Sequence, residues 1–375
     1  MKNFQIRIGL VGFGSMGRTH LWSVRNLPFF YGIRIGEVVG VCTTDLVRSE
    51  RICSDFGIST AYSDASQMIA DSSIDVIDIC TPNNSHFPIL SKALTSSKSV
   101  LCEKPLCFSA EEAREIARLS AASPRTCGMV FNNRWLAPVI RAKELIASGD
   151  LGKILHFSAS YLHNSCLDPS RTVGWKQDKT ICGGGVLPDL GSHLIDLMSF
   201  LCGRFRSVGG MEQIAFPTHK KSDGTVWNTN AEEAFFLRAQ TEQGAYGTLT
   251  VSKISQGTND DLSFEIYGEN GSLRFSLMNP NWLEYYDASA PANARGFTRI
   301  ECVGRYPEMI FPSPKAPAGW LYGHLASMHA FLTAVAEEKA FSPSLSDGVY
   351  VQYVMDAAYR SAKKNGIMTE VCPCL

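Results

Sequence analysis

The residues best suited to move a proton stand in two short clusters. The first is the run SVLCEKPLC, in which Glu103, Lys104 and Pro105 follow an apolar stretch. A lysine amine that is partly removed from water has a lowered pKa and can exchange a proton near neutrality. Because Pro105 favours an extended backbone for the residue before it, we expect Lys104 to be held at the end of that stretch. A solvated Glu–Lys ion pair is the alternative interpretation.

The second cluster lies in the run CGGGVLPDLGSHLIDL. If this run is helical, Asp189, His193 and Asp196 stand at positions i, i+4 and i+7 and share one face among apolar neighbours. A carboxylate and an imidazole that converge there could deprotonate a hydroxyl while a hydride leaves its carbon. Two alternatives stay open, a hydrogen-bonded core histidine and a metal site, since both side chains are also metal ligands.

A glycine-rich loop near the amino terminus indicates where a nucleotide would bind. In IGLVGFGSMGRTH, Gly12, Gly14 and Gly17 follow a predicted strand and open a predicted helix. In that context the first glycine permits a tight turn, the second admits a pyrophosphate, and the third lets the helix approach the strand. The free N–H groups of the helix start favour phosphate. The alternative is a glycine turn that binds nothing.

The next predicted strand ends without the acidic residue that would contact the ribose hydroxyls of NAD. Thr43 and Thr44 occupy its tip, Asp45 follows, and Arg48 lies within reach. Hydroxyls and a guanidinium suit the 2′-phosphate of NADP, whereas Asp45 could still turn to the ribose. The sequence therefore leaves NAD and NADP open, and Arg48 could also be an ordinary exposed helix residue.

These motifs need a scaffold, and the first third of the chain supplies one. Apolar runs alternate with amphipathic stretches through short links, which predicts parallel strands in a doubly wound, Rossmann-type sheet. The run SAEEA begins one helix with a capping box, Ser109 followed three residues later by Glu112. We expect strands over 5–11, 37–42, 75–80, 99–102 and 127–131, and helices over 15–26, 48–56, 65–70, 85–95 and 110–121.

The rest of the chain has a different rhythm. Short runs separated by Gly, Asn and Asp turns predict antiparallel strands, so the second domain is expected to be α+β with a large, mostly antiparallel open sheet. We place the Rossmann domain at residues 1–130 and the second at 131–375. The predicted elements are helices over 138–148, 323–337 and 346–364 and strands over 154–163, 234–241, 245–252, 262–267 and 271–276.

Composition and charge exclude several classes of protein. A chain of 375 residues, of which 45% are hydrophobic, is long enough for two buried cores. Its 35 Lys and Arg nearly balance 36 Asp and Glu, which argues against a nucleic-acid binder. No apolar run approaches a membrane span, and Gln5 and Arg7 interrupt any signal peptide. We therefore expect a cytoplasmic protein that binds neither nucleic acid nor membrane.

The 12 cysteines favour neither disulfides nor zinc. There is no Cys-x-x-Cys pair, and most cysteines outside the carboxyl-terminal tail, such as Cys42 and Cys102, sit in apolar runs where a thiol behaves as a small hydrophobic group. We expect reduced, structural cysteines and no metal.

Taken together, these motifs resemble the glucose–fructose oxidoreductase/inositol dehydrogenase (Gfo/Idh/MocA) family. The resemblance covers nearly the whole chain. The glycine loop alone is weak evidence, whereas the Glu-Lys-Pro motif and the Asp189/His193 pattern are specific. The shared order and spacing include Gly12-x-Gly14-x-x-Gly17, Thr81-Pro82-Asn83-x-x-His86, Glu103-Lys104-Pro105, Asn132-x-Arg134-Trp135-x-x-Pro138 and Asp347-Gly348, besides the Asp189/His193 motif with its glycines.

The resemblance implies that a substrate lies between the two domains, over the nicotinamide. Lys104 would then hydrogen-bond the reacting hydroxyl, Asp189 and His193 would form the acid–base pair, and no catalytic metal would be used. It also implies an open sheet that mediates oligomers, so we expect a homodimer or homotetramer through the second domain. Typical substrates would be sugars, inositols and related polyols, with NAD or NADP as cofactor.

The motifs and the resemblance together give the predicted site. The catalytic residues are Lys104, Asp189 and His193. Predicted substrate contacts add Tyr161, His163 and Trp175, in a segment that resembles only part of the family. Predicted cofactor contacts are Gly12, Phe13, Gly14, Ser15, Met16, Gly17, Thr43, Thr44, Arg48, Thr81, Pro82, Asn83, His86, Glu103, Lys104 and Arg134.

Two other classes of function remain. Relatives in the family cleave glycosidic bonds with a tightly bound nucleotide that is transiently reduced, and the same residue types would serve that hydrolysis. A non-catalytic nucleotide sensor would be expected to lack Lys104 or His193, and both are present. A dehydrogenase that acts on a ring hydroxyl is the leading hypothesis.

Overall fold

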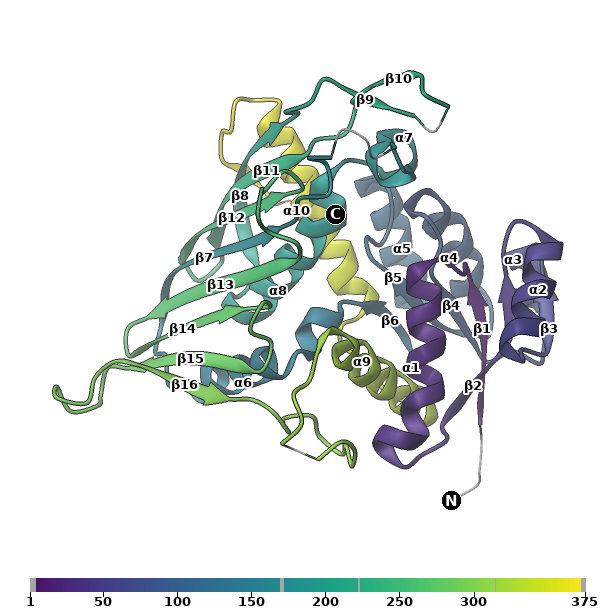
Figure 1. Ribbon diagram of the computed structural model, residues 1–375, viewed down its shortest axis with the longest axis horizontal. Coiled ribbons are helices and arrows are strands. Elements are labelled where there is room, and N and C mark those ends of the chain that lie inside the picture. The colour runs from purple at the N-terminus through teal and green to yellow at the C-terminus, as the bar shows by residue number, and fades with distance from the viewer. Residues whose placement is uncertain (1–4, 169–171, 222, 314, 372–375) are drawn as a thin grey trace. The chain divides into compact units, whose positions relative to one another are not determined.

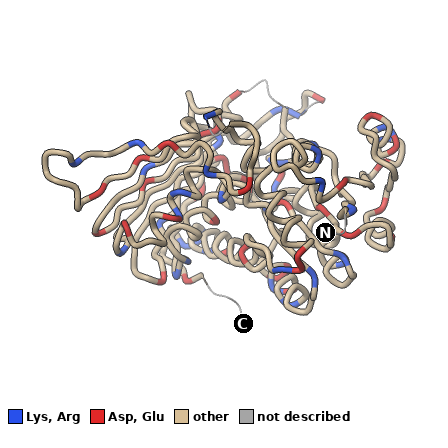
Figure 2. The backbone as a smooth tube through the Cα atoms, turned by 90° about the horizontal axis from the view of Figure 1, so that it is seen from below, with Lys and Arg blue, Asp and Glu red and all other residues tan. Residues whose placement is uncertain are grey.

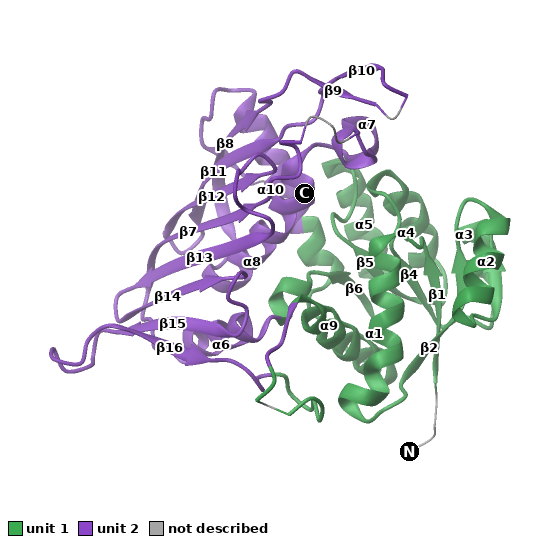
Figure 3. Ribbon diagram, in the orientation of Figure 1, with its two compact units in different colours: residues 1–135, 306–316, 320–349 green, residues 136–305, 317–319, 350–375 purple. Residues whose placement is uncertain are grey.

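The structure is a computed structural model that describes residues 5–168, 172–221, 223–313 and 315–371. The chain forms two compact units, coloured separately in Figure 3. The first contains residues 1–135, 306–316 and 320–349, and the second contains 136–305, 317–319 and 350–375. Residues 306–316 and 320–349, which the sequence analysis places in the second domain, thus belong to the first compact unit.

The first unit is built on a parallel six-stranded sheet with the order β3-β2-β1-β4-β5-β6 (Figure 1). The chain starts in the middle, adds strands outward on one side and then returns to add strands on the other. This reversal beside β1 is the switch point at which doubly wound sheets bind ligands. The strands are β1 (Ile6–Val11), β2 (Gly36–Cys42), β3 (Thr60–Tyr62), β4 (Val76–Ile79), β5 (Ser99–Glu103) and β6 (Cys127–Val130).

Side-chain caps start several helices of this unit. Asp45 and Asp64 each accept a backbone N–H, and Ser109 accepts that of Glu112 as the capping pattern predicts. The helix α9, distant in sequence, lies against α1, and its Phe331 and Leu332 join the apolar core of the sheet. The helices are α1 (Ser15–Tyr31), α2 (Leu46–Phe56), α3 (Ala65–Ala70), α4 (His86–Leu94), α5 (Ala110–Ala122) and α9 (Trp320–Ala336), with the short η1 (Asn83–Ser85) and η2 (Asn132–Trp135).

The second unit is built on a nine-stranded sheet with the order β16-β15-β14-β13-β7-β12-β11-β8-β17 (Figure 1). Its neighbours pair antiparallel except β7 and β12, which are parallel. The strands are β7 (Ile154–Leu162), β8 (Phe205–Gln213), β11 (Ala234–Thr241), β12 (Tyr246–Ser252), β13 (Asp261–Gly268), β14 (Gly271–Ser276), β15 (Trp282–Asp287), β16 (Phe297–Glu301) and β17 (Thr369–Glu370).

Burial alternates along the central strands of this sheet. Leu262, Phe264 and Ile266 of β13 are buried, while the residues between them are half-exposed. One face therefore holds the core, and the oligomer interface expected on the sheet stays a prediction. The remaining elements are α6 (Ala137–Ala147), η3 (Trp175–Gln177), α7 (Lys179–Cys182), η4 (Leu187–Gly191), α8 (Ser192–Cys202), α10 (Leu345–Ala362) and the hairpin of β9 (Thr218–Lys220) with β10 (Val226–Asn228).

The predicted fold class is confirmed, a Rossmann domain followed by an α+β domain with a mostly antiparallel sheet. Figure 2 shows basic and acidic residues interspersed along the chain, unlike the basic stripe of a nucleic-acid binder. Within the described ranges, no helix has both the length and the apolar character that crossing a bilayer requires.

Candidate active site

The three glycines of the loop after β1 are required for different reasons. Gly12 has φ +92°, and a Cβ there would lie 2.5 Å from the carbonyl oxygen of Cys80. A Cβ at Gly17 would overlap the carbonyl oxygen of Gly12, so α1 approaches β1 only without a side chain. A Cβ at Gly14 would meet no protein atom within 4 Å. The space at Gly14 is thus open for a ligand, which fits a pyrophosphate at the start of α1.

The neighbouring loop residues divide into two kinds. Gly14 precedes α1 without a side-chain cap, so that Ser15 and Met16 offer the N–H groups of the first turn to an anion. Phe13 instead turns its ring into the core, 5.2 Å from that of Phe56. Only its backbone can serve the nucleotide site.

The end of β2 brings Arg48 to the glycine loop. Arg48 is exposed, and its guanidinium donates to the carbonyl oxygen of Phe13 at 3.3 Å. The Thr43 hydroxyl donates to the carbonyl oxygen of Asp45 at 2.8 Å, and the Asp45 carboxylate caps α2 by accepting the N–H of Val47 at 3.0 Å. Asp45 therefore has a structural role of its own, and Thr44 is exposed beside it.

The loops that follow β4 and β5 are tied together by His86. The two ring nitrogens of this buried histidine lie 2.7 Å from the carbonyl oxygen of Pro105 and 2.9 Å from that of Thr81. These contacts hold the predicted Thr81–Asn83 segment beside the end of β5. A direct contact of His86 with the cofactor stays a prediction.

Lys104 stands where the sequence predicts, directly after β5. Glu103 is only 4% exposed, so the solvated Glu–Lys pair is wrong for this carboxylate. Instead, Glu103 accepts the backbone N–H of Lys104 at 3.0 Å, and its other oxygen lies 3.2 Å from Nε2 of His20. Lys104 thus stands at the carboxyl end of β5, and these two contacts fix the carboxylate of Glu103 beside it.

Arg134 is buried in the first unit by side-chain contacts. Its guanidinium donates to the Ser342 hydroxyl at 3.3 Å and lies 3.4 Å from the carboxylate of Asp347. Two residues from separate motifs of the sequence analysis, Arg134 and Asp347, thus form an ion pair. A role of Arg134 in binding the cofactor stays a prediction.

The glycine run before Asp189 serves close packing in the second unit. A Cβ at Gly185 would overlap the backbone of Glu232, and one at Gly184 would overlap the Tyr359 hydroxyl. Glu232 in turn accepts the N–H of Leu187 at 3.0 Å and so fixes the start of the next turn.

The helix expected for Asp189, His193 and Asp196 forms, but it begins with a π turn. Leu187–Gly191 is π-helical and α8 starts at Ser192. A π turn holds more residues than an α turn, so Asp189 and His193 are not related by a regular α-helical turn, and their convergence on one face stays a prediction. Asp196 is buried at 2% exposure, whereas Asp189 and His193 are partly exposed.

Two lysines hold the carboxylate of Asp189. Nζ of Lys176, on η3, lies 2.8 Å from Oδ1, and Nζ of Lys253, just after β12, lies 3.1 Å from Oδ2. Burial alone would lower the pKa of Lys253, but the carboxylate of Asp189 raises it above its ordinary value. The Asp189 carboxylate thus lies between a buried and an exposed ammonium.

Two predicted substrate residues lie at the end of β7: Tyr161 within the strand, beside His193, and His163 directly after it. The Tyr161 ring lies 5.2 Å from that of His163 and 6.1 Å from that of His193. His163 contacts the Asp260 carboxylate at 2.8 Å, and burial together with Asp260 raises the pKa of Tyr161 well above its ordinary value. Trp175 is 39% exposed on η3, next to Lys176. The second unit thus combines an imidazole, a phenol and a paired carboxylate.

Comparison with known proteins identifies the family. A model described as "Oxidoreductase family, NAD-binding Rossmann fold" matches residues 6–131, and one described as "Oxidoreductase family, C-terminal alpha/beta domain" matches residues 143–370. The chain belongs to this oxidoreductase family. Residues 6–131 are therefore the NAD-binding Rossmann domain of the family, and the protein is an enzyme.

Relatives within this oxidoreductase family resemble the chain over nearly its whole length. Levoglucosan dehydrogenase of Pseudarthrobacter phenanthrenivorans is 29% identical over 96% of each chain. Glucose-6-phosphate 3-dehydrogenase of Bacillus subtilis is 26% identical over 93% of this chain and 94% of that protein. A solved levoglucosan dehydrogenase in complex with NADH and levoglucosan superposes with a TM-score of 0.94 at 28% identity, covering 98% of this chain and 100% of the other.

Gly14→Val is expected to abolish cofactor binding in this oxidoreductase without unfolding it. The valine side chain would enter the open space at the start of α1, where it meets no protein atom but would exclude a pyrophosphate. Calorimetric titration with NAD and NADP measures the loss. Gly296→Val is a matched control, because a Cβ there also meets no atom within 4 Å. Unchanged affinity in Gly14→Val would remove the loop from the cofactor site.

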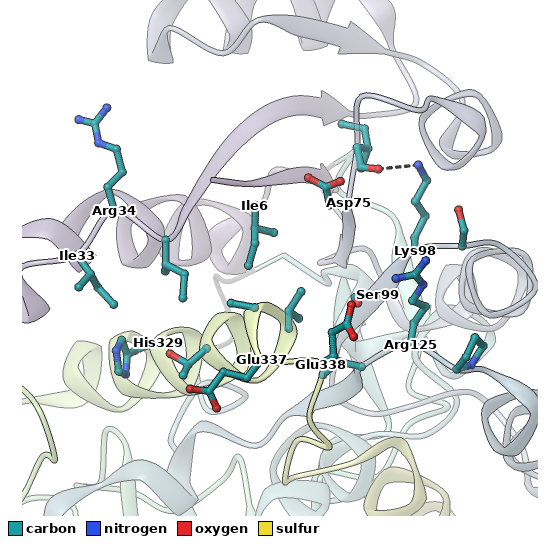
Figure 4. Close-up of a pocket in the computed structure, with 18 of the residues that line it drawn as sticks. Ile6, Ile33, Arg34, Asp75, Lys98, Ser99, Arg125, His329, Glu337 and Glu338 are labelled. Carbon is teal, nitrogen blue, oxygen red and sulfur yellow. Dashed lines mark hydrogen bonds between the residues drawn. The ribbon is translucent and has the colours of Figure 1, made fainter. Parts of the chain in front are cut away.

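A large cavity of the oxidoreductase's Rossmann unit lies at the opposite edge of the sheet (Figure 4). It measures about 1430 Å³ and is lined at the amino ends of four strands, by residues such as Ile6, Asp75, Ser99 and Thr126. In open α/β sheets ligands bind at the carboxyl ends, where the glycine loop and Lys104 stand. Lys98 in this cavity donates to the carbonyl oxygens of Asp71 and Ile74, each at 2.6 Å, so its ammonium serves the fold.

Sequence reasoning missed three residues of the site. Lys253 ends a strand much as Lys104 does, and that position was the available signal. His20 and Asp78 stand inside apolar runs of α1 and β4, where a charged group requires a partner. They contact each other, and His20 also contacts Glu103.

Proposed function

We propose that this oxidoreductase transfers a hydride between NAD or NADP and a ring hydroxyl of a sugar, glycoside or inositol-type polyol. The full-length similarity to levoglucosan dehydrogenase supports this proposal most strongly, because that enzyme was solved with NADH and a sugar. The presence of Lys104, Asp189 and His193 is consistent with it. The named relatives are dehydrogenases, which favours this function over the hydrolase alternative.

His193 is the proposed base. It accepts the proton of the sugar hydroxyl, and the neighbouring Tyr161 ring limits the directions in which its imidazole can turn. The ammonium of Lys104 donates a hydrogen bond to the same hydroxyl oxygen and stabilises the negative charge that develops there. The nicotinamide, when bound, supplies the hydride acceptor.

Asp189 is the proposed anchor for a second hydroxyl of the sugar. Its Oδ2 is held by the buried Lys253, whereas its Oδ1 is held by Lys176, whose side chain is 49% exposed. A sugar hydroxyl could replace the exposed lysine at small cost, because an exposed ion pair contributes only about 0–1 kcal/mol. Lys253 would keep the carboxylate ionised and in place while this exchange occurs.

Arg48 is expected to favour NADP. Because its guanidinium lies at the glycine loop, where it donates to the carbonyl oxygen of Phe13, we expect it to bind the 2′-phosphate. Arg48→Ala should lower the affinity for NADP by about tenfold or more and leave the affinity for NAD nearly unchanged. A hydrogen bond to a charged group contributes about 1.5–3 kcal/mol. Thr43→Asp should shift preference towards NAD by charge repulsion. Arg51→Ala, exposed on the same helix, is the control. A wild-type enzyme that strongly prefers NAD would contradict this placement and favour Asp45 as the ribose ligand.

The experiment for the function is a substrate panel with both cofactors. Levoglucosan, glucose-6-phosphate, alkyl glucosides, free hexoses and inositols are each incubated with the enzyme while the absorbance of the reduced nicotinamide is followed. Stoichiometric reduction by at least one sugar supports the proposal. Cleavage of an aryl glycoside without reduction of added cofactor would replace it with the hydrolase.

A further inference from the structure

A cluster of charged side chains is buried beneath Lys104 in the first unit. It is centred on His20, whose side chain is 2% exposed. His20 lies on α1, three residues after Gly17. Asp78 lies on β4 and Glu103 ends β5, so the cluster connects the helix of the glycine loop with two neighbouring strands.

Both ring nitrogens of His20 face carboxylates. Nδ1 lies 2.8 Å from Oδ2 and 3.0 Å from Oδ1 of Asp78, and Nε2 lies 3.2 Å from Oε1 of Glu103. The Sγ atom of Cys80 also lies 3.2 Å from Nδ1. A neutral imidazole carries one N–H and can donate to only one of the two carboxylates, whereas an imidazolium donates to both.

The charges agree with an imidazolium. Burial opposes a charge on His20, but Asp78 and its neighbours raise the pKa of His20 well above its ordinary value. Burial would likewise raise the pKa of Glu103, yet His20 lowers it to about 2. Other titratable groups beside the cluster are Lys104 and Cys102, which interact electrostatically with Glu103, and His324 of α9, whose ring lies 6.1 Å from that of His20. Burial lowers the pKa of His324 to about 3, so it stays neutral, and neither of its nitrogens has a hydrogen-bond partner among the described residues.

We propose that His20 is a positioning residue for Lys104, a buried imidazolium that bridges Asp78 and Glu103 and thereby fixes the end of β5. The proposal rests on the catalytic role proposed for Lys104. Oε1 of Glu103 faces His20, and Oε2 accepts the Lys104 backbone N–H at 3.0 Å. The orientation of one carboxylate thus sets the position from which the lysine side chain leaves the strand.

The same histidine couples the two parts of the nucleotide-binding edge. α1 begins at the glycine loop and carries His20 just over one turn further on, where it is joined to β4 and β5. Asp78 and Glu103 carry two negative charges against the one positive charge of His20. The charge of Lys104 in turn helps to lower the pKa of Glu103.

His20→Gln tests this role. Glutamine can donate to a carboxylate but carries no charge, so two buried carboxylates would face each other without a cation. We expect kcat to fall by about tenfold to 100-fold, a typical effect of small misplacement, while KM changes less. Burial would then raise the pKa of Glu103, and this carboxylate would take up a proton as the pH falls. The variant should therefore show an additional loss of kcat on the acid side, beyond the loss that protonation of His193 gives the wild type.

A second substitution separates charge from packing. In His20→Gln/Glu103→Gln one of the two facing carboxylates is removed, so the additional acid loss of kcat should disappear even if kcat stays low. His329→Gln is the matched control. Like His20, His329 is buried, but it lies on α9 and its ring stacks on that of Tyr31, 3.7 Å away. Loss of activity in His20→Gln with an unchanged pH profile would overturn the proposal, since general destabilisation has that result.

A measurement without activity tests the charge itself. Histidine-labelled wild-type enzyme contains eight imidazoles, and their protonation can be followed by NMR from about pH 6 to about pH 9. We expect one resonance to remain an imidazolium throughout, to be absent in His20→Gln and to shift in Asp78→Asn. The Asp78→Asn variant gives the assignment if His20→Gln does not fold. A His20 resonance that titrates at the ordinary pKa of histidine would overturn the proposal.

Two further outcomes keep this proposal distinct from others. His20, Glu103 and His324 place one potential ligand atom each within 4.8 Å of one another, so metal analysis is part of the test. One equivalent of a transition metal, lost in His324→Leu, would overturn the charge bridge in favour of a metal site.

If Lys104→Ala keeps full activity, the catalytic assignment of Lys104 fails. Full activity of His20→Gln alongside an inactive Lys104→Ala refutes only the role of His20.

Discussion

Lys104→Ala is expected to lower kcat by about 10²- to 10⁴-fold, the usual effect of losing a group that assists proton transfer. The lysine stands at the carboxyl end of β5, the edge at which doubly wound sheets bind ligands, and its backbone is fixed by Glu103. Alanine removes the ammonium that donates to the reacting oxygen. Steady-state kinetics with the best sugar of the panel measures kcat and KM, and calorimetry measures cofactor affinity.

The control for this substitution is Lys92→Ala, which removes an exposed lysine from α4 in the same unit. It should keep wild-type kcat. Cofactor affinity of Lys104→Ala should fall less than kcat, because the glycine loop supplies the phosphate contacts. A variant that keeps more than about a tenth of wild-type kcat would exclude Lys104 from the chemistry, since an acid–base group contributes more than that.

His193→Ala is expected to lower kcat by a similar factor, about 10²- to 10⁴-fold, with cofactor affinity nearly unchanged. The wild-type rate should rise with pH as the base loses its proton, and this rise should be absent from the variant. A pH profile of kcat for both proteins measures the difference. His156→Ala is the control, because His156 is an exposed histidine of β7 in the same unit.

The contrary result for this second substitution is also informative. If His193→Ala retains more than about a tenth of wild-type turnover on the true substrate, His193 is not the base. Lys104 would then be the sole candidate for the proton transfer, and the rise of kcat with pH should persist in His193→Ala.

Much of the Rossmann unit follows from local sequence. Short apolar runs bounded by polar links specify buried parallel strands, and Ser109 specifies the start of α5 through its own hydroxyl. The requirement for glycine at Gly12 and Gly17 is likewise local, because it arises from one strand–turn–helix unit. These features could be predicted because the contacts that determine them lie close together in sequence.

Other features depend on contacts between distant segments. The π turn at Asp189 follows a glycine run that packs against Glu232, a residue on another loop. The lysine partners of Asp189 come from η3 and from the end of β12, and no spacing in the sequence links them. The same holds for α9, which joins the core of the first unit although more than half of the chain separates it from α1.

The His20 bridge lies between these two cases. A histidine in a buried helix and an aspartate in a buried strand each require a partner, because burying an unpaired charge is costly. Only the sheet order, which places β4 between β1 and β5, shows that they meet each other and Glu103. Pairing of buried charges could thus be anticipated from sequence, while the identity of the pairs required the fold.

The most direct test of the proposed function is transfer of deuterium from sugar to cofactor. A sugar that reduces the nicotinamide in the panel is deuterated at each ring carbon in turn and incubated with the enzyme, and the cofactor is examined by mass spectrometry. The account predicts that one labelled position gives deuterated reduced nicotinamide in proportion to the keto-sugar formed, and that Lys104→Ala and His193→Ala slow the transfer together. Oxidised sugar without label in the cofactor, or glycoside cleavage with no reduction of added cofactor, would contradict it.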